Sequence, residues 1–104
     1  MTGKTYTYDC FGEKYKVQIR RGWYEGGRPA LELVSDTEGP VSKITVNMPE
    51  VKLEPGEILV KTWSENEPMT DFLIKSGIAE DTGKRAKAGY AEAWVMRLLE
   101  KEMT

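Results

Sequence analysis

The sequence predicts an α+β domain, namely an antiparallel sheet of about five or six strands with one short helix packed on one face. Two patterns lead to this expectation. Apolar and polar residues alternate along several segments, as in half-buried strands, whereas the spacing of an amphipathic helix is clearest in one short segment. A length of 104 residues suits one domain with one core, so residues 1–104 are expected to form a single globular domain.

The N-terminal part is expected to form two β-hairpins. In residues 4–20, tyrosine, valine and isoleucine alternate with lysine, glutamine and arginine after a turn at Gly12. The glycine-rich segment WYEGGRP (23–29) predicts a loop. The second hairpin pairs ALELV (30–34) with VSKITVNM (41–48) across the turn SDTEGP.

A central strand and the helix are expected next. The segment EILVKTW (57–63) contains three consecutive apolar residues, which predicts a strand buried on both faces. Met69, Phe72 and Leu73 lie at positions i, i+3 and i+4 of EPMTDFLIKSG (67–77) and form one apolar stripe. We therefore expect this short helix to cover the second face of the strand.

The C-terminal segment GYAEAWVMRLLEKEMT is compatible with two structures. It contains strong helix formers and its apolar residues fit a helical stripe, but they also fit one face of a strand that begins after Gly89. The pattern alone leaves both open, and we take residues 90–98 as the last strand. In that arrangement we expect Trp63, Phe72 and Trp94 to meet in the core.

The polar segment WSENEPM joins the central strand to the helix, and its residues suit a structural corner. Ser64 and Asn66 are preferred N-cap residues, and Pro68 suits the first helical turn. At the other end, Gly77 can adopt the left-handed conformation that ends many helices.

The competing interpretation of this segment is a carboxylate site for a divalent cation. Glu65, Glu67 and Asp71 are close in sequence, but they lack the alternating oxygen ligands and the central glycine of a calcium loop. We therefore expect these carboxylates to complement the positive start of the helix and to bind no metal.

The residue composition argues against an enzyme. The chain contains no histidine, which removes Ser-His-Asp catalysis and most transition-metal sites. The single cysteine, Cys10, cannot form an internal disulfide, and we expect it to pack in the core. The segment GIAEDTGKR (77–85) differs from a phosphate-binding P-loop, because five residues separate its glycines and Arg85 follows Lys84. We expect no catalytic residues and no cofactor.

Nothing in the sequence indicates a membrane or an exported protein. No apolar run approaches the roughly 20 residues that a membrane-spanning helix needs. The start MTGKTYTYD lacks the apolar stretch of a signal peptide. We expect a cytoplasmic protein with no membrane partner.

Basic residues cluster in one part of the chain and indicate a candidate nucleic-acid-binding surface. Trp23 and Tyr24 lie within this cluster, where aromatic rings can stack on bases. The net charge of −2 and the pI near 5.3 favour the alternative, a solvated sheet face, because nonspecific nucleic-acid binding depends mainly on neutralising phosphates. The candidate nucleic-acid-binding residues are Lys14, Lys16, Arg20, Arg21 and Arg28.

The segments VNMPE, EILVKTWSENEPM, KSGI and TGK, in this order, resemble a family of small bacterial proteins of similar length that occur on plasmids, phages and other mobile elements. The resemblance covers residues 30–98, and its most specific part is the SENE motif after an apolar strand. Pro68 stands where a glycine is expected in such proteins. The family is a domain of unknown function, so the resemblance implies an accessory protein of a mobile element and a strand-like C-terminal segment, but no catalytic or binding residues.

The sequence therefore favours a non-enzymatic function. We expect a small accessory or interaction protein whose exposed loops bind another protein. The alternative is a weak nucleic-acid-binding module that uses the basic face of the second strand. The salt dependence of binding distinguishes the two functions, because phosphate-driven binding weakens steeply as the salt concentration rises.

Overall fold

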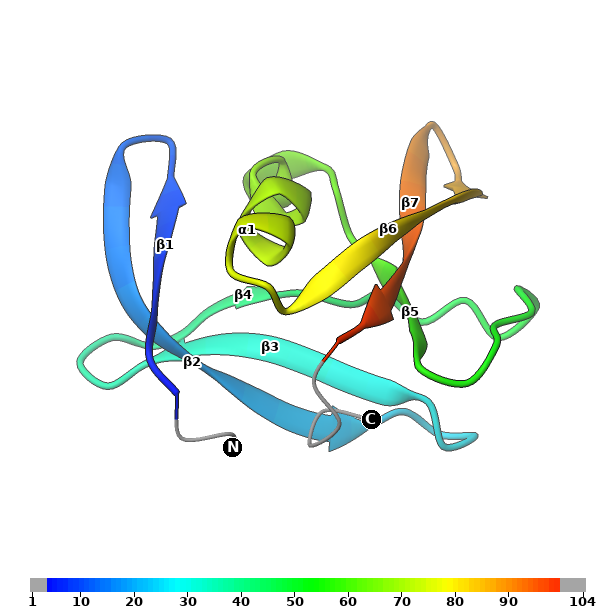
Figure 1. The fold of residues 1–104 in the computed structure, drawn as a ribbon, viewed down its shortest axis with the longest axis horizontal. Coiled ribbons are helices and arrows are strands. Elements are labelled where there is room, and N and C mark those ends of the chain that lie inside the picture. The colour runs from blue at the N-terminus through cyan, green and yellow to red at the C-terminus, as the bar shows by residue number, and fades with distance from the viewer. Residues whose placement is uncertain (1–3, 100–104) are drawn as a thin grey trace.

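The structure is a computed structural model that describes residues 4–99. This part of the chain contains seven strands, one 3₁₀ helix and one α-helix (Figure 1). The strands are β1 (Tyr6–Cys10), β2 (Glu13–Trp23), β3 (Pro29–Ser35), β4 (Gly39–Lys43), β5 (Glu57–Val60), β6 (Ala79–Ala88) and β7 (Ala91–Leu98). The helices η1 (Ser64–Asn66) and α1 (Met69–Lys75) lie between β5 and β6 in the chain. The predicted α+β class is confirmed.

The strands form two antiparallel sheets, where the sequence predicted one. Their orders are β1-β2-β3-β4 and β5-β7-β6. The chain passes from one sheet to the other through residues 44–46. One backbone amide of this segment donates to the carbonyl of Leu31 in β3 (2.9 Å), and another donates to the carbonyl of Leu59 in β5 (3.1 Å). The strand expected over 41–48 therefore ends at Lys43, because the next residues turn to pair with the second sheet.

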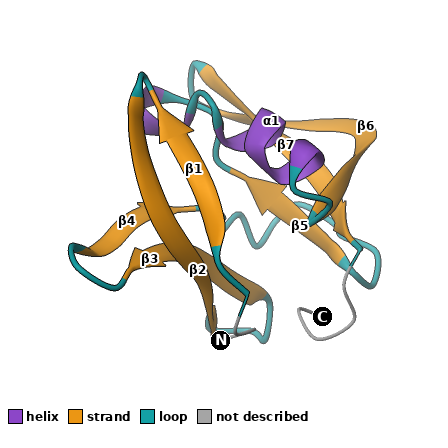
Figure 2. Ribbon diagram, turned by 60° about the vertical axis from the view of Figure 1, so that its left-hand side comes forward, coloured by secondary structure: helices purple, strands orange, loops and turns teal. Residues whose placement is uncertain are grey.

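Helix α1 lies between the two sheets (Figures 1 and 2). Its buried side chains are Met69, Phe72 and Leu73, as the apolar spacing predicted. A helix of seven residues is too short to be stable alone, so burial of this stripe holds it in place. The stripe joins a large hydrophobic cluster with residues of both sheets, namely Tyr8, Val17, Ile19, Leu31, Leu33, Ile44, Ile58, Val60, Ile78, Ala79, Met96 and Leu98.

Strand β5 is buried on both faces, as predicted from its run of apolar residues. Ile58 and Val60 belong to the large cluster that includes α1, whereas Leu59 belongs to a second, smaller cluster. Helix α1 thus covers only one of the two faces. The other is covered by the segment that precedes β5, which contributes Val46, Met48, Val51 and Leu53.

The C-terminal end of α1 forms as the sequence predicted. Gly77 has a φ of +71°, and its N–H donates to the carbonyl of Ile74 (3.1 Å). The N–H of Ile78 donates to the carbonyl of Leu73 (3.0 Å). This pair of hydrogen bonds is a Schellman motif, in which glycine adopts the left-handed conformation without strain.

The predicted cap at the N-terminal end is wrong. The N-cap of α1 is Pro68, with no side-chain hydrogen bond, and neither Ser64 nor Asn66 caps the helix. The side chain of Asn66 is buried and joins η1 to β4. Its Oδ1 accepts a hydrogen bond from the hydroxyl of Ser42 (2.5 Å), and its Nδ2 donates to the carbonyl of Lys43. The Asn66 side-chain amide therefore links η1 to β4, where the corner meets the first sheet.

The C-terminal segment is a strand, as expected for residues 90–98, while residues 100–104 lie outside the described part of the chain. Strand β7 forms a hairpin with β6, and their register shifts between Asp81 and Lys84. Strand β6 was not predicted, because most of its side chains are exposed and polar and show no apolar alternation.

The expected meeting of three aromatic residues in the core is wrong. Phe72 lies in the large cluster, edge-on to Tyr6 and Tyr8 with ring centroids 6.2 and 5.1 Å away. Trp94 packs against the same cluster, whereas Trp63 packs against the second one. Trp63 follows β5 at an even spacing from Leu59, so it faces the same side as Leu59 and not the helix.

Candidate functional site

Three of the five candidate nucleic-acid-binding residues share one face of β2. Lys14, Lys16 and Arg20 are exposed and alternate with Tyr15, Val17 and Ile19, which are partly or fully buried. The predicted alternation is thus present. It places these three cations on the outer face of the first sheet, away from α1.

Acidic residues lie next to these cations. Asp9 is the cross-strand partner of Lys14, and Nε of Arg20 donates to Oε1 of Glu32 on β3 (2.9 Å). Asp36 and Glu38 line a shallow hollow together with Lys14 and Lys16. The outer face is therefore mixed in charge.

The other two candidates point elsewhere. The guanidinium of Arg21 lies over the ring of Trp23, 4.3 Å from its centroid. Arg28 donates to the backbone carbonyls of Met48 (2.8 Å) and Val51, so it ties the β2–β3 turn to the segment before β5. Arg21 borders the same hollow as Arg20, although its guanidinium points to Trp23, whereas Arg28 lies apart from the three cations of the outer face.

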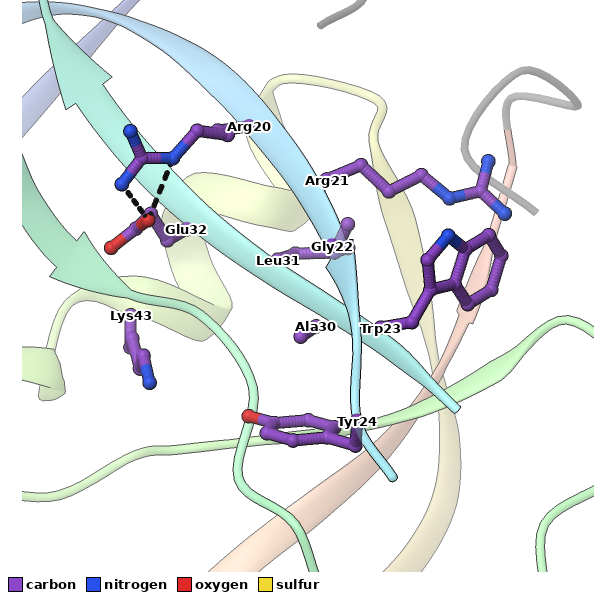
Figure 3. Close-up of a pocket in the computed structure, with 9 residues that line it drawn as sticks. All are labelled: Arg20, Arg21, Gly22, Trp23, Tyr24, Ala30, Leu31, Glu32 and Lys43. Carbon is purple, nitrogen blue, oxygen red and sulfur yellow. Dashed lines mark hydrogen bonds and ion pairs between the residues drawn. The ribbon is translucent and has the colours of Figure 1, made fainter. Parts of the chain in front are cut away.

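A hollow of about 390 Å³ lies at the end of that face (Figure 3). The small residues Gly22 and Ala30 lie in its middle, and Lys43 and Tyr24 border it. The hydroxyl of Tyr24 is 3.2 Å from the carbonyl of Thr45 and 3.0 Å from its Oγ1, which fixes the ring. Tyr24 and Trp23 diverge in Figure 3, so they do not form one stacking platform.

Two of the three carboxylates of the corner, Glu65 and Asp71, are paired with lysines. Glu65 lies 3.1 Å from Nζ of Lys61, and Asp71 lies 2.9 Å from Nζ of Lys75. Hydrogen bonds from its own backbone N–H and from Lys61, with the charge of that lysine, lower the pKa of the Glu65 carboxyl. Residues 4–99 contain no group of three or more His, Cys, Asp or Glu side chains placed to share a metal ion.

Two exposed aromatic residues at hairpin turns were not predicted from the sequence. Phe11 lies in the β1–β2 turn, is 69% exposed and has a φ of +53°. Tyr90 lies in the β6–β7 turn and is fully exposed. Both turns lie at the upper side of Figure 1. The dipeptides Phe-Gly and Gly-Tyr mark these turns in the sequence, but exposure of the rings follows only from the fold.

The corner between β5 and α1 lies between these two hairpins. The backbone carbonyl of Glu65 accepts hydrogen bonds from the hydroxyl of Tyr8 (3.3 Å) and the thiol of Cys10 (3.5 Å) in β1. The hydroxyl of Thr62 donates to the carbonyl of Glu92 in β7 (2.6 Å). Cys10 is half-buried against the core, and the corner is hydrogen-bonded to one strand of each hairpin. We call the set formed by Phe11, Tyr90 and the segment 62–65 the hairpin end.

A buried carboxylate lies in the second sheet, at the end opposite the hairpin end. The side chain of Glu57 has no exposed surface, and its Oε2 lies 2.8 Å from Nζ of Lys84 and 3.7 Å from a guanidinium nitrogen of Arg97. Burial alone raises the pKa of this carboxyl. Hydrogen bonds from Lys84 and from the Glu54 N–H, with the charges of Lys84 and Arg97, outweigh burial and lower the pKa below its ordinary value. The group is therefore an ionised structural anchor between β5, β6 and β7.

No helix among residues 4–99 is long and apolar enough to cross a membrane. Comparison with protein-family models, with curated proteins and with solved structures found no match to this chain.

Proposed function

We propose that this chain is a small, non-enzymatic, cytoplasmic protein that binds another protein through its exposed loops. The observation that carries this proposal is the pair of exposed aromatic side chains, Phe11 and Tyr90, at the hairpin end. The likeness of the SENE segment to proteins of mobile elements supports an accessory role for a plasmid or phage, with a host protein as the partner.

Aromatic side chains bury a large area on binding and are enriched among the residues that dominate protein interfaces. Phe11 adds a second argument. Its φ of +53° is in the left-handed region, where asparagine and glycine are favoured and where another residue costs on the order of 1 kcal/mol. An exposed phenylalanine in this position stabilises neither the turn nor the core, which supports a role in recognition.

The experiment is affinity purification from bacterial host cells with quantitative mass spectrometry. The wild type is compared with the double variant Phe11→Asn/Tyr90→Asn, and Ile74→Asn is the matched control. Ile74 is another exposed apolar side chain, on α1 and away from the hairpin turns. We expect a partner that the wild type and the control retain and that the double variant loses. Capture of the same proteins by all three would contradict the proposal.

Weak nucleic-acid binding is the second candidate function. It is supported by the outer face that carries Lys14, Lys16 and Arg20 and by the hollow next to Lys43. The acidic neighbours of these cations reduce the expected affinity, so we predict a dissociation constant for single-stranded DNA no tighter than roughly 10⁻⁴–10⁻⁶ M at physiological salt. A salt-sensitive nanomolar affinity, lost when the three cations of β2 are reversed in charge, would make this the better function.

A further inference from the structure

The two sheets have four outer edges, at β1, β4, β5 and β6, and three of them are paired or protected in the described part of the chain. Residues 44–46 pair with β5 through two hydrogen bonds, of which one runs from the Lys61 N–H to the Ile44 carbonyl (2.9 Å). The side-chain amide of Asn66 donates to the backbone carbonyl of Lys43 at the end of β4. The edge of β5 is thus paired within the chain, whereas β4 is bonded only at its end but contains Pro40 and a register shift against β3, both of which hinder pairing.

Features of the β6 sequence hinder pairing of its edge with another strand. Its register is broken between Asp81 and Lys84, and Gly83 in this bulge has a φ of +86°. The strand is rich in charged side chains, and Arg85 is held by Asp81 (2.8 Å) and lies over the ring of Trp94, 3.8 Å from its centroid. Bulges and charges are the devices by which natural sheets prevent an edge from pairing with another strand.

Strand β1 carries one charged residue, Asp9, and no other of these devices. Its register with β2 is unbroken over Tyr6–Cys10, and it contains no proline or bulge. The two strands are joined by a two-residue turn, so Cys10 and Glu13 exchange both ladder hydrogen bonds and every second residue of β1 does the same. The N–H and C=O of the residues between, Thr7 and Asp9, therefore point away from β2 toward the edge. No backbone hydrogen bond within residues 4–99 is made there.

These two residues line a groove of about 180 Å³ whose opposite wall is α1. The helix contributes Asp71, Phe72 and Lys75 to this wall. Pro68 and Phe72 are the apolar residues of the groove lining, and the Phe72 ring lies edge-on to Tyr8. An unpaired strand edge beside a helix, with an apolar side chain between them, matches the geometry of domains that bind a peptide as an additional strand.

We propose that the groove between β1 and α1 binds an extended peptide segment of a partner protein, which pairs with Thr7 and Asp9 as an added strand. This deepens the proposed function, because it names the form in which one part of the partner is bound. The side chain opposite Tyr8 would project toward Phe72 and should be apolar. The neighbouring side chain opposite Asp9 should be basic, because the Asp9 carboxylate accepts the Gly12 N–H (2.9 Å) but forms no ion pair within residues 4–99, whereas Asp71 across the groove is already paired with Lys75.

The test uses a phage library of random peptides selected on the wild-type protein. We expect enriched sequences that contain an apolar residue next to lysine or arginine, with β-branched residues around them. A synthetic peptide of the enriched sequence is then titrated into the protein, and amide hydrogen exchange is followed by NMR. The amides of Thr7 and Asp9 should exchange fast in the free protein and become protected by the peptide.

A matched pair of variants isolates the backbone contribution. Thr7→Pro removes the edge N–H, which the β1–β2 ladder does not use, whereas Thr7→Val retains it and removes only the hydroxyl. Binding should weaken about tenfold or more in Thr7→Pro, the effect of one lost hydrogen bond, and should be retained in Thr7→Val. Asp9→Lys should abolish the preference for basic peptides.

Three results would overturn the proposal: no enriched peptide, protection elsewhere without protection of Thr7 and Asp9, or equal binding by Thr7→Pro and Thr7→Val. If Thr7→Pro does not fold, the hydrogen-exchange measurement on the wild type still tests whether the peptide protects the amides of Thr7 and Asp9. A negative result here leaves the role of the hairpin end intact, because that role is tested separately with the variants of Phe11 and Tyr90.

Discussion

Replacement of Asn66 by alanine is the sharpest test of how the corner between β5 and α1 is held. The buried side chain makes two hydrogen bonds to β4, with the hydroxyl of Ser42 and the carbonyl of Lys43. The substitution removes both and leaves their partners unsatisfied at a site with little access to water. Each such loss costs about 1–3 kcal/mol, so we expect Asn66→Ala to lower the free energy of unfolding by about 2–4 kcal/mol.

The alternative explanation of Asn66 as a helix N-cap predicts a smaller effect. Loss of a cap costs about 1 kcal/mol. Ser64→Ala is the matched control, because Ser64 is exposed at the same corner and caps no helix. We expect Ser64→Ala to change the free energy of unfolding by no more than about 0.5 kcal/mol.

The assay is urea denaturation followed by tryptophan fluorescence, with a double-mutant cycle between Asn66 and Ser42. If the two side chains interact directly, Asn66→Ala and Ser42→Ala should be coupled by about 0.5–3 kcal/mol. A cost of 1 kcal/mol or less for Asn66→Ala, together with additive effects in the cycle, would refute the role of Asn66 as a link to β4.

Four further perturbations test other parts of the structure. Phe72→Ala should lower the free energy of unfolding by about 3–5 kcal/mol in the same assay, and a loss under about 1 kcal/mol would place Phe72 outside the core. Gly77→Ala should cost about 1–2 kcal/mol, because alanine at a φ of +71° is strained; no loss would contradict the Schellman motif. Phe11→Asn should leave thermal stability unchanged or raise it, and a clear destabilisation would assign Phe11 a structural role. The lowered pKa of Glu57 predicts stability that is present above the ordinary glutamate pKa and is lost as the pH falls through the lower folded value. Glu57→Gln should reduce that acid dependence in denaturation curves measured at several pH values, and an unaltered pH profile would count against the anchor.

The parts of the fold that the sequence predicted are those in which burial follows a local period. The stripe of α1 and the alternation in β2 are examples, since each reflects one buried face of one element. Strand β6 was missed because its exposed edge carries no such period. The division into two sheets was missed because it depends on residues 44–46, whose hydrogen bonds are made with β3 and with β5 across the sequence.

In the candidate sites, too, the sequence pattern predicted which face a side chain lies on but not its partners from distant parts of the chain. Alternation placed Lys14, Lys16 and Arg20 on one face correctly, but it did not reveal that Glu32 pairs with one of them. The function of Asn66 was also misjudged, because a cap is a local interaction and its actual partners are 24 and 23 residues away. The exposure of Phe11 and Tyr90 depends on how the two hairpins are oriented by the rest of the fold.

The most direct test of the central claim is the dissociation constant of the purified partner, measured by calorimetry for the wild type and for Phe11→Asn/Tyr90→Asn at low and high salt. Two aromatic residues at the centre of an interface each contribute about 2 kcal/mol or more, so we predict an affinity at least about a hundredfold weaker in the double variant. We also predict little change of the wild-type affinity with salt. An equal affinity in the double variant, or a wild-type affinity that falls steeply with salt, would contradict the claim that the hairpin end binds a protein.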